Sequence, residues 1–264
     1  MITILKKIKN KFLKKKANYN LHLYEKYSHD DIKNKRFVNL GSGIFNHPYW
    51  TCVDIAEANE NMYPHGFPKD YIDLNFSDPK FVLPFNNSSI KAFYCSHCIE
   101  HINTKSIQRL FDEVYRSLDR EGIIRITCPD INLALNALKN NDKYFFDPEN
   151  KNKDKNIFEL FFNEWVDPIC KYHGNVEYLQ KGIRDKLLFE ESFLENLFEP
   201  KYKKSLNGHI NFLNENKIKL LLTQSGFKKI FFKRYNQSNN PIFLDLKFFD
   251  VNYYNLSLYV EAIK

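Results

Sequence analysis

The chain has 264 residues, of which 43% are hydrophobic and 27% charged, and its mean hydropathy is -0.52. This balance predicts a soluble globular protein with room for one sizeable α/β domain or two small ones. No apolar run approaches the roughly 18 residues of a membrane-spanning helix, which excludes an integral membrane protein. With 8 Gly, 10 Pro and 16% aromatic residues, collagen-like and wholly disordered chains are excluded too.

The positive charge of the chain is concentrated at its N-terminus. The net charge is +7, from 39 Lys and Arg against 32 Asp and Glu, but residues 1–16 hold seven lysines and no acid. The rest of the chain therefore has equal numbers of basic and acidic residues. A protein that acts on nucleic acid spreads basic residues over its working face, so the neutral body argues against a nucleic-acid substrate.

Residues 1–35 are predicted to form a basic extension ahead of a domain at 36–264. Leu5, Ile8 and Phe12 recur at helical spacing among the lysines, which makes the segment amphipathic. One interpretation is that the segment makes peripheral contact with an anionic membrane surface, where each Lys contributes about 1 kcal/mol to binding. The alternative is a solvated terminal helix. No signal-peptide core follows the lysines, so a cytoplasmic protein is expected, at the inner membrane face under the first alternative.

Five cysteines, an odd number, fit reduced thiols in the cytoplasm better than a disulfide framework. Cys95 and Cys98 form a lone CxxC pair, and no second pair is present to complete a structural zinc site. We therefore expect the cysteines to pack as small apolar side chains.

The first part of the domain alternates short apolar runs with helical periodicity. The predicted elements, in chain order, are strands at 36–40, 51–55, 71–74 and 90–96, a helix at 104–118 and a strand at 123–128. Glu121 and Gly122 are expected to end the helix before the last of these strands. Apolar strands separated by helices are typical of a parallel sheet covered on both faces, so the fold class is expected to be α/β.

Residues 131–205 break this rhythm and are predicted to form a helical cap insertion. Helices are expected around 133–138, 157–165 and 183–197. A segment of this length between strands commonly carries substrate specificity. The earlier pattern then resumes with a helix at 218–224 and strands at 227–233 and 256–264.

The first strand runs directly into the turn Gly41–Gly43, and glycines there let the backbone approach a ligand at the carboxyl edge of a sheet. Asp54 closes the second strand, where it can accept hydrogen bonds from ribose hydroxyls, and Asp73 ends the third, beside the place for an adenine ring. A dinucleotide fingerprint needs a third glycine, where this chain has Asn46, and an acid about 20 residues on. Since phosphate-binding loops are also absent from the sequence, a nucleoside cofactor without phosphates is expected.

Several strings of residues are similar to those of class I S-adenosylmethionine (SAM) methyltransferases. They are VNLGSG, TCVDI, YIDLN, LPFNNSSIKAFYCSHCIEHI, LFDEVYRSLDREG and IIRITCPD, all within 36–130. NLGSG, SHCIEHI and the later NGHINFLNENKIKLLLTQSGF and LSLYVEAIK more narrowly resemble a bacterial subgroup linked to surface-glycan biosynthesis. The resemblance implies SAM as cofactor and a Rossmann-like seven-stranded sheet, mostly parallel with the last strand antiparallel.

The resemblance also implies which residues hold SAM. The turn Gly41–Gly43 would face its methionine part, Asp54 its ribose, and Asp73 with Leu74 its adenine. The full implied set is Asn39, Gly41, Ser42, Gly43, Asp54, Ile55, Asp73, Leu74 and Ser96. Asn39 departs from the acid that is frequent at its position in the family, and residues 44–50 are too few for an ordinary crossover helix.

A histidine-rich cluster at the end of the fourth strand is predicted to supply the chemistry. A neutral hydroxyl is a poor nucleophile, so its methylation benefits from a base within hydrogen-bond reach. His97 or His101 is the favoured base, in which case no metal is needed and Glu100 orients the imidazole or contacts the substrate. An alternative is a divalent-metal site in which His209 supplies the missing ligand. A third interpretation is that Glu100 and His101 only cap the following helix.

Two more residues are candidates for contact with the substrate. Asp130, at the tip of the fifth strand, is expected to bind a sugar hydroxyl or to act as the base, and the alternative is an N-cap. His209, at the far boundary of the cap, is expected to contact the substrate or to be an ordinary loop histidine. The aromatic residues 144–146 and Trp165 are expected to pack in the core of the cap rather than to stack on a substrate.

The leading hypothesis is a SAM-dependent O-methyltransferase acting on a sugar or nucleotide-sugar substrate for capsule or lipopolysaccharide. The sugar follows from the resemblance alone. Alternatives are methylation of a small metabolite or lipid precursor, and a non-catalytic SAM-binding scaffold in glycan assembly. Residues 95–98 lack the Asn/Asp-Pro-Pro-aromatic motif that marks methylation of amino groups on bases, which favours hydroxyl chemistry.

Overall fold

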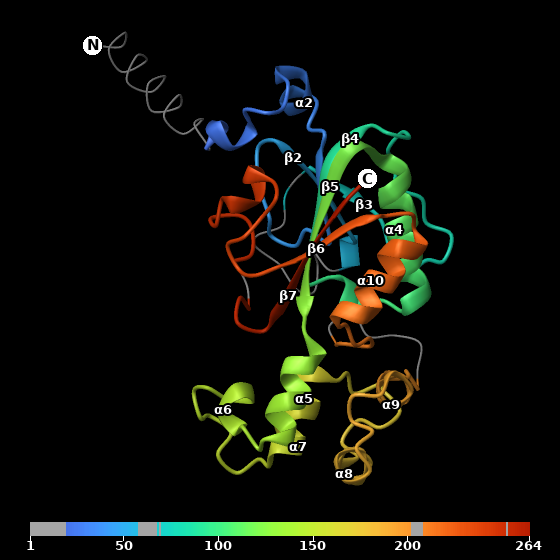
Figure 1. Cartoon of the computed structure of the whole chain (residues 1–264), viewed down its shortest axis with the longest axis vertical. Coiled ribbons are helices and arrows are strands. Elements are labelled where there is room, and N and C mark those ends of the chain that lie inside the picture. Colours follow the sequence, from blue (N-terminus) through green and yellow to red (C-terminus); the bar gives the residue numbers. More distant parts are fainter. Residues whose placement is uncertain (1–19, 58–67, 69, 202–207, 252) are drawn as a thin grey trace, which may run out of the picture.

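The computed structural model describes residues 20–57, 68, 70–201, 208–251 and 253–264 (Figure 1). The amphipathic lysine-rich segment predicted at 1–16 lies outside these residues. Across the described part of the chain, none of the helices has the length and apolar character needed to span a membrane.

A seven-stranded sheet with the order β3-β2-β1-β4-β5-β7-β6 forms the centre of the domain. Strands β1 to β5 pair in parallel, and β7 pairs antiparallel with both β5 and β6. This confirms the predicted α/β class and the Rossmann-like, mostly parallel sheet whose last strand is antiparallel. The strands are β1 (Phe37–Leu40), β2 (Trp50–Asp54), β3 (Tyr71–Asp73), β4 (Ile90–Ser96), β5 (Leu118–Pro129), β6 (Lys229–Lys233) and β7 (Ser257–Ile263).

Strand β1 lies at the point where the strand order reverses. It pairs with β2 on one side and with β4 on the other. Connections from β1 and from β4 therefore leave the sheet in opposite directions, which opens a crevice at their carboxyl ends. The predicted Gly41–Gly43 turn and the histidine cluster after β4 both start from this edge.

Strand β5 begins earlier than the sequence predicted. Its pairing with β4 jumps from Ile90↔Leu118 to Ala92↔Ile123, so residues 119–122 bulge out of the ladder. Glu121 has a φ of 60°, a left-handed conformation that helps the chain to turn within the bulge. The expected break at Glu121 and Gly122 is therefore a bulge inside a strand rather than a separate turn.

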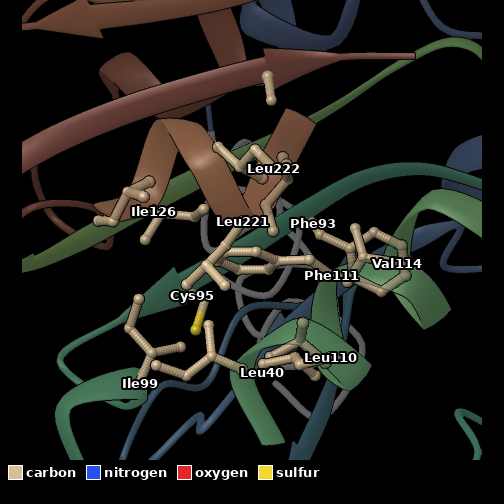
Figure 2. Close-up of a cluster of buried hydrophobic side chains, with 14 of the residues drawn as sticks. Leu40, Phe93, Cys95, Ile99, Leu110, Phe111, Val114, Ile126, Leu221 and Leu222 are labelled. Carbon is tan, nitrogen blue, oxygen red and sulfur yellow. The ribbon is translucent and has the colours of Figure 1, made fainter. Parts of the chain in front are cut away.

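Alternate side chains of the strands pack on the two faces of the sheet. Leu40, Phe93 and Cys95 join α4 (Thr104–Ser117) and α10 (Glu215–Gln224) in the cluster that Figure 2 shows. The neighbouring positions point the other way because successive strand side chains alternate. There they meet η1 (Leu21–Tyr24), α2 (His29–Lys33) and η3 (Pro241–Leu244) in an aromatic cluster of Tyr24, Phe37, Trp50, Tyr94, Phe243 and Phe249.

The cap between β5 and α10 consists of several short helices with a hydrophobic cluster of their own, below the sheet in Figure 1. They are α5 (Ile131–Lys139), α6 (Lys143–Phe146), α7 (Ile157–Trp165), α8 (Val176–Arg184) and α9 (Glu191–Phe198). The single helix predicted at 183–197 is wrong, because α8 ends in a Schellman motif. Lys186 has a φ of 59°, and the Leu187 N–H donates to the Gly182 carbonyl at 2.8 Å.

Candidate functional site

The Gly41–Gly43 turn leaves β1 in a conformation that its glycines make accessible. Gly41 has a φ of +64° and Gly43 one of +50°, both in the left-handed region. A Cβ atom on Gly41 would lie 2.4 Å from the Cys98 Sγ atom, far inside a van der Waals contact. The turn from β1 therefore packs directly on the segment that follows β4, and glycine is the residue that permits it.

Asp54, at the end of β2, holds this turn. Its Oδ2 atom accepts a hydrogen bond from the Gly43 N–H at 2.7 Å, and its Oδ1 atom accepts one from the Ile55 N–H at 2.8 Å. Burial raises the pKa of Asp54, and the two backbone hydrogen bonds oppose that shift. A carboxylate has about four acceptor sites, so two backbone donors leave capacity for ribose hydroxyls.

The ends of β2 and β3 meet at the predicted adenine side. Asp73 accepts a hydrogen bond from the Ala56 N–H at 2.9 Å, and the Leu74 N–H donates to the Asp54 carbonyl at 2.8 Å. The Asp73 side chain is exposed. Asp54, Ile55, Asp73 and Leu74 are therefore gathered at one edge of the sheet.

Two further members of the predicted cofactor set lie on the strands themselves. Asn39 on β1 is buried, and its Oδ1 atom has no hydrogen-bond partner among the described residues. A buried acceptor without a donor lowers the stability of the fold. The ammonium group of SAM could supply the missing donor to Asn39 Oδ1. Ser96 on β4 accepts a hydrogen bond from the Thr127 hydroxyl at 2.7 Å, and Ser42 is buried in the turn. The residues present thus fit SAM.

The chain after β4 starts with a histidine whose ring nitrogens both have neighbours. His97 has a φ of 49°, and its Nε2 atom lies 2.8 Å from the Ser257 Oγ atom. Ser257 uses its own hydroxyl hydrogen on the Tyr253 carbonyl, so the His97 Nε2–H donates. The Nδ1 atom lies 3.2 Å from Glu100 Oε1. His97 is therefore held from two sides.

Glu100, in η2 (Ile99–His101), is almost completely buried, with 1% of its surface exposed. Burial alone would raise its pKa, but the surrounding imidazoles of His97, His101 and His209 outweigh that effect and lower it. The approach of His97 is close enough for an ion pair, yet neither carboxylate oxygen has a partner in hydrogen-bond geometry. The site therefore holds a buried carboxylate whose hydrogen-bonding capacity is unused.

A clamp of three hydrogen bonds brings the segment at 208–211 onto the one at 100–102. His101 Nδ1 donates to the Gly208 carbonyl at 3.0 Å, and the Ile210 N–H donates to the Glu100 carbonyl at 3.1 Å. The Asn211 side-chain amide donates to the Ile102 carbonyl at 3.1 Å. Because Nδ1 of His101 carries the hydrogen, Nε2 of the neutral ring has a free lone pair.

The clamp places His209 beside His101, with ring centroids 5.3 Å apart. Burial lowers the pKa of His209, which favours the neutral imidazole. One ligand atom each from Glu100, His101 and His209 lies within 4.8 Å of the other two. The structure thus brings together three of the residues that the sequence proposed for a metal site. His97 is not part of this group, although its Nδ1 atom lies close to Glu100 Oε1.

Asp130 lies at the tip of β5 and caps α5. Its side chain accepts a hydrogen bond from the Asn132 N–H at 3.0 Å, which is the N-cap contact. Burial raises the pKa of the Asp130 carboxyl, which makes it more basic than an exposed aspartate. The capping contact engages one oxygen, so a role toward substrate stays a prediction.

Two cavities adjoin this cluster. A small one of about 10 Å³ is lined by Glu100, Pro129, Ile131, Trp165, Phe198, His209, Asn211, Phe212 and Leu213. A larger one of about 310 Å³ is lined by Asn163, Glu164, Val166, Asp167, Pro168, Gly208 and His209. His209 therefore lies between the cluster and a cavity of the size that small-molecule ligands occupy. Trp165 is buried and stacks on Phe145 in the cap core.

Sequence reasoning missed three residues that shape the site. Ser257 and Tyr253 hold His97, and Asp167 packs so tightly on Gly208 that a Cβ there would lie 1.5 Å from its Oδ2 atom. Tyr253 lies on the loop before β7, Ser257 is the first residue of β7, and Asp167 follows α7, all remote in the chain from His97 and His101. No local pattern marks them, because their importance arises only from the tertiary contact.

Part of the chain is similar to a known protein family. Residues 45–126, from before β2 into β5, match the family model of a methyltransferase domain. The chain has no significant match among the curated proteins.

Several solved structures resemble the chain at low sequence identity. A SAM-dependent methyltransferase from Mesorhizobium loti shares 15% identity over 87% of this chain and 90% of that chain, with a TM-score of 0.40. One from Methanosarcina mazei shares 14% identity over 86% and 91% of the two chains, with a TM-score of 0.42. Human N-acetylserotonin methyltransferase, solved with SAM, shares 12% identity over 89% of this chain and 50% of its own, with a TM-score of 0.39.

The likenesses to solved structures are too weak to bear on the methyl acceptor. The family match starts just after the Gly41–Gly43 turn and includes Asp54, at the end of β2. Residues 45–126 thus resemble a methyltransferase domain, and they lie in a sheet with the Rossmann-like strand order described above.

Proposed function

We propose that the chain transfers the methyl group of SAM to a hydroxyl of a sugar, activated as a nucleotide sugar, for a bacterial surface glycan such as capsule or lipopolysaccharide. Bound SAM supplies an electrophilic methyl group on a sulfonium centre. In the transfer, the hydroxyl oxygen forms a bond to the methyl carbon, the carbon–sulfur bond breaks, and the hydroxyl proton leaves. The chain must align the hydroxyl and provide for its proton.

The observation that best supports methylation of a hydroxyl is the hydrogen bonding of the His101 ring. Its Nδ1–H is engaged by the Gly208 carbonyl at 3.0 Å, which leaves a lone pair on Nε2. A quarter of the side chain is exposed, so a substrate can reach it. We assign this lone pair to activation of the hydroxyl, as a base or as the ligand of a cation. His97 is less suited to take the proton, since Ser257 and Glu100 occupy both sides of its ring.

The cavity of about 310 Å³ beside His209 supports a polar acceptor. Asn163, Glu164 and Asp167 contribute side chains with hydrogen-bonding groups to its lining. Asp167 is 1% exposed, and its Oδ2 atom has no hydrogen-bond partner among the described residues. A sugar offers hydroxyl donors for such oxygens. The identity of the sugar still rests on the resemblance in sequence. Contact of residues 1–16 with an anionic membrane surface is likewise a prediction from sequence.

The test is incubation of the chain with SAM and a panel of nucleotide sugars, followed by mass spectrometry. We expect one acceptor to gain a single methyl group. The variant His101→Gln should lose about 10²- to 10⁴-fold in rate, the usual contribution of acid–base catalysis, and should bind SAM as the wild type does. His29→Gln, at an exposed position on α2, is the matched control and should keep full activity.

Two other results would change the assignment. Methylation of a lipid precursor or small metabolite, with no sugar accepted, would keep the enzyme and replace its substrate. SAM binding without transfer to any acceptor in the panel would instead support a non-catalytic scaffold. Asp54→Ala, compared with exposed Asp154→Ala, should abolish SAM binding in either case.

A further inference from the structure

We propose that Glu100, His101 and His209 hold a divalent transition-metal cation, and that this cation binds the acceptor hydroxyl. The role toward the hydroxyl rests on the proposed function, whereas the cation site is argued from its own geometry. One carboxylate and two imidazoles form a ligand set that leaves coordination positions open for substrate.

The three side chains are spaced for a common ion. One ligand atom from each lies within 4.8 Å of the others, and His101 Nε2 is 3.9 Å from Glu100 Oε1. Two ligands that are each about 2.1 Å from an ion lie at most about 4.2 Å apart. Small rotations of the side chains would therefore bring all three atoms into coordination distance.

The burial of Glu100 calls for a positive charge. With 1% of the residue exposed and no hydrogen-bond partner at either oxygen among the described residues, the carboxylate lacks the compensation that buried charges normally have. The basic groups near it are the imidazoles of His97, His101 and His209. A bound cation would provide the compensation without protonation of a histidine.

Both proposed histidine ligands have a neighbour that restrains them. His101 donates its Nδ1–H to the Gly208 carbonyl, and the His209 ring meets the Trp165 ring edge-on with centroids 6.4 Å apart. Metal-bound histidines almost always donate their other ring N–H to a carbonyl, carboxylate or water, which fixes the tautomer and ring orientation. The anchoring thus directs Nε2 of His101 toward Glu100.

The space at the cluster is of the right size. The cavity of about 10 Å³ is lined by both Glu100 and His209, and it is close to the volume that one water needs. A divalent transition-metal ion is smaller than a water molecule. The larger cavity reaches His209 from the cap side, which provides a route by which an acceptor could complete the coordination.

Two nitrogen donors and one carboxylate favour a particular class of ion. Imidazole suits first-row transition metals such as Mn²⁺, Co²⁺ and Zn²⁺, whereas Mg²⁺ and Ca²⁺ prefer all-oxygen surroundings. An ion at this position would lower the pKa of a hydroxyl bound to it. His97 lies beside this ligand set, with its Nδ1 atom 3.2 Å from Glu100 Oε1, and it acts as a positioning residue when Nδ1 as well as Nε2 carries a hydrogen.

The test is titration of chelator-treated full-length protein with Co²⁺ in the absence of SAM, followed by absorption spectroscopy. We expect one equivalent to bind with the d–d bands of nitrogen and oxygen ligation. A thiolate-to-cobalt charge-transfer band would place the ion on cysteine instead and overturn the assignment. Mg²⁺ at the same concentration should not displace Co²⁺.

Variants locate the ion. Glu100→Gln, His101→Gln and His209→Gln should each weaken Co²⁺ binding by at least about 100-fold, because each removes a ligand. His97→Gln should weaken it by about 10-fold, as loss of a positioning contact does. His29→Gln is the matched control and should bind as the wild type does. If Glu100→Gln fails to fold, the two histidine variants carry the test, since both side chains are only partly buried.

The possible failures are distinguishable. If Co²⁺ does not bind at millimolar concentration, or binds equally well to all the variants, the cation site is disproved, while methyl transfer by the chelated protein would leave the proposed function intact. If Co²⁺ binds as expected but no hydroxyl acceptor is methylated, the proposed function fails and the site remains.

Discussion

The His101 imidazole donates a hydrogen bond to the Gly208 carbonyl at 3.0 Å, across a separation of 107 residues in the chain. This contact joins the end of the histidine cluster after β4 to the start of the segment that leads into α10. It fixes the ring orientation of His101 and determines which nitrogen has the lone pair. The geometry of the candidate site therefore depends on a backbone carbonyl of a remote loop.

Substitution of Gly208 should disturb this contact without removal of any reactive group. A Cβ atom there would lie 1.5 Å from Asp167 Oδ2, so Gly208→Ala must shift the backbone on which His101 depends. We expect a loss of activity at least about 10-fold, with SAM binding retained, because the cofactor turn is elsewhere. Steady-state kinetics and SAM titration measure both. Wild-type activity in Gly208→Ala would show that the contact is dispensable.

Gly41→Ala should damage the cofactor turn more than backbone strain alone explains. The added methyl would lie 2.4 Å from Cys98 Sγ, in addition to the strain at a φ of +64°. Gly174→Ala is a matched control, since Gly174 has a φ of +73° and no atom within 4 Å of the added Cβ. We expect Gly174→Ala to lose about 1 kcal/mol of stability. Gly41→Ala should lose about 1–3 kcal/mol more than this control, and it alone should lose affinity for SAM. Urea unfolding and SAM titration would test this; equal losses would contradict it.

Arg125 on β5 should be essential for stability. Its Nη1 atom donates to Glu261 on β7 at 2.8 Å, its guanidinium also pairs with Asp250, and all three side chains are fully buried. Arg125→Met would leave two buried carboxylates without a counterion, at a cost of about 3–5 kcal/mol. The exposed pair of Lys229 with Glu121 is the comparison, and Lys229→Met should cost below about 1 kcal/mol. Similar urea midpoints for the two variants would refute the distinction.

His47 should make the protein less stable as the pH falls. It lies buried in the aromatic cluster, and burial lowers its pKa from 6.5 to about 4. Between these values the unfolded chain binds a proton that the folded protein does not, so the free energy of unfolding decreases as pH falls from 6.5 to 4. The decrease is at most roughly 3 kcal/mol.

His47→Phe should remove this contribution and flatten the dependence of stability on pH. The ring packs among Phe45, Tyr49 and Phe248, so phenylalanine keeps the aromatic contacts. The variant also loses the hydrogen bond from the Tyr49 N–H, which changes its stability at every pH. The measurement is therefore the slope of the unfolding free energy against pH rather than its absolute value. Parallel slopes for wild type and variant would disprove the assignment.

Local patterns predicted the strands well where the backbone is regular. Strand β4 and helix α7 begin and end at the residues expected from the sequence. The start of β5 differed, because pairing with β4 accommodates a bulge at 119–122 that composition cannot reveal. The helix predicted at 183–197 is divided by Lys186 in a left-handed conformation, although lysine carries no signal for such a cap.

The sequence by itself determined the sheet class, the glycine turn and the acids at the strand ends, because hydrophobic periodicity and local backbone requirements are properties of short segments. Only the tertiary structure decided that His209 meets Glu100 and His101, that His97 is held by Ser257, and that Asp167 packs on Gly208. These contacts join segments separated by dozens of residues. Their geometry depends on how the cap and the strand β7 pack against the segment after β4, and no short segment of the chain encodes that.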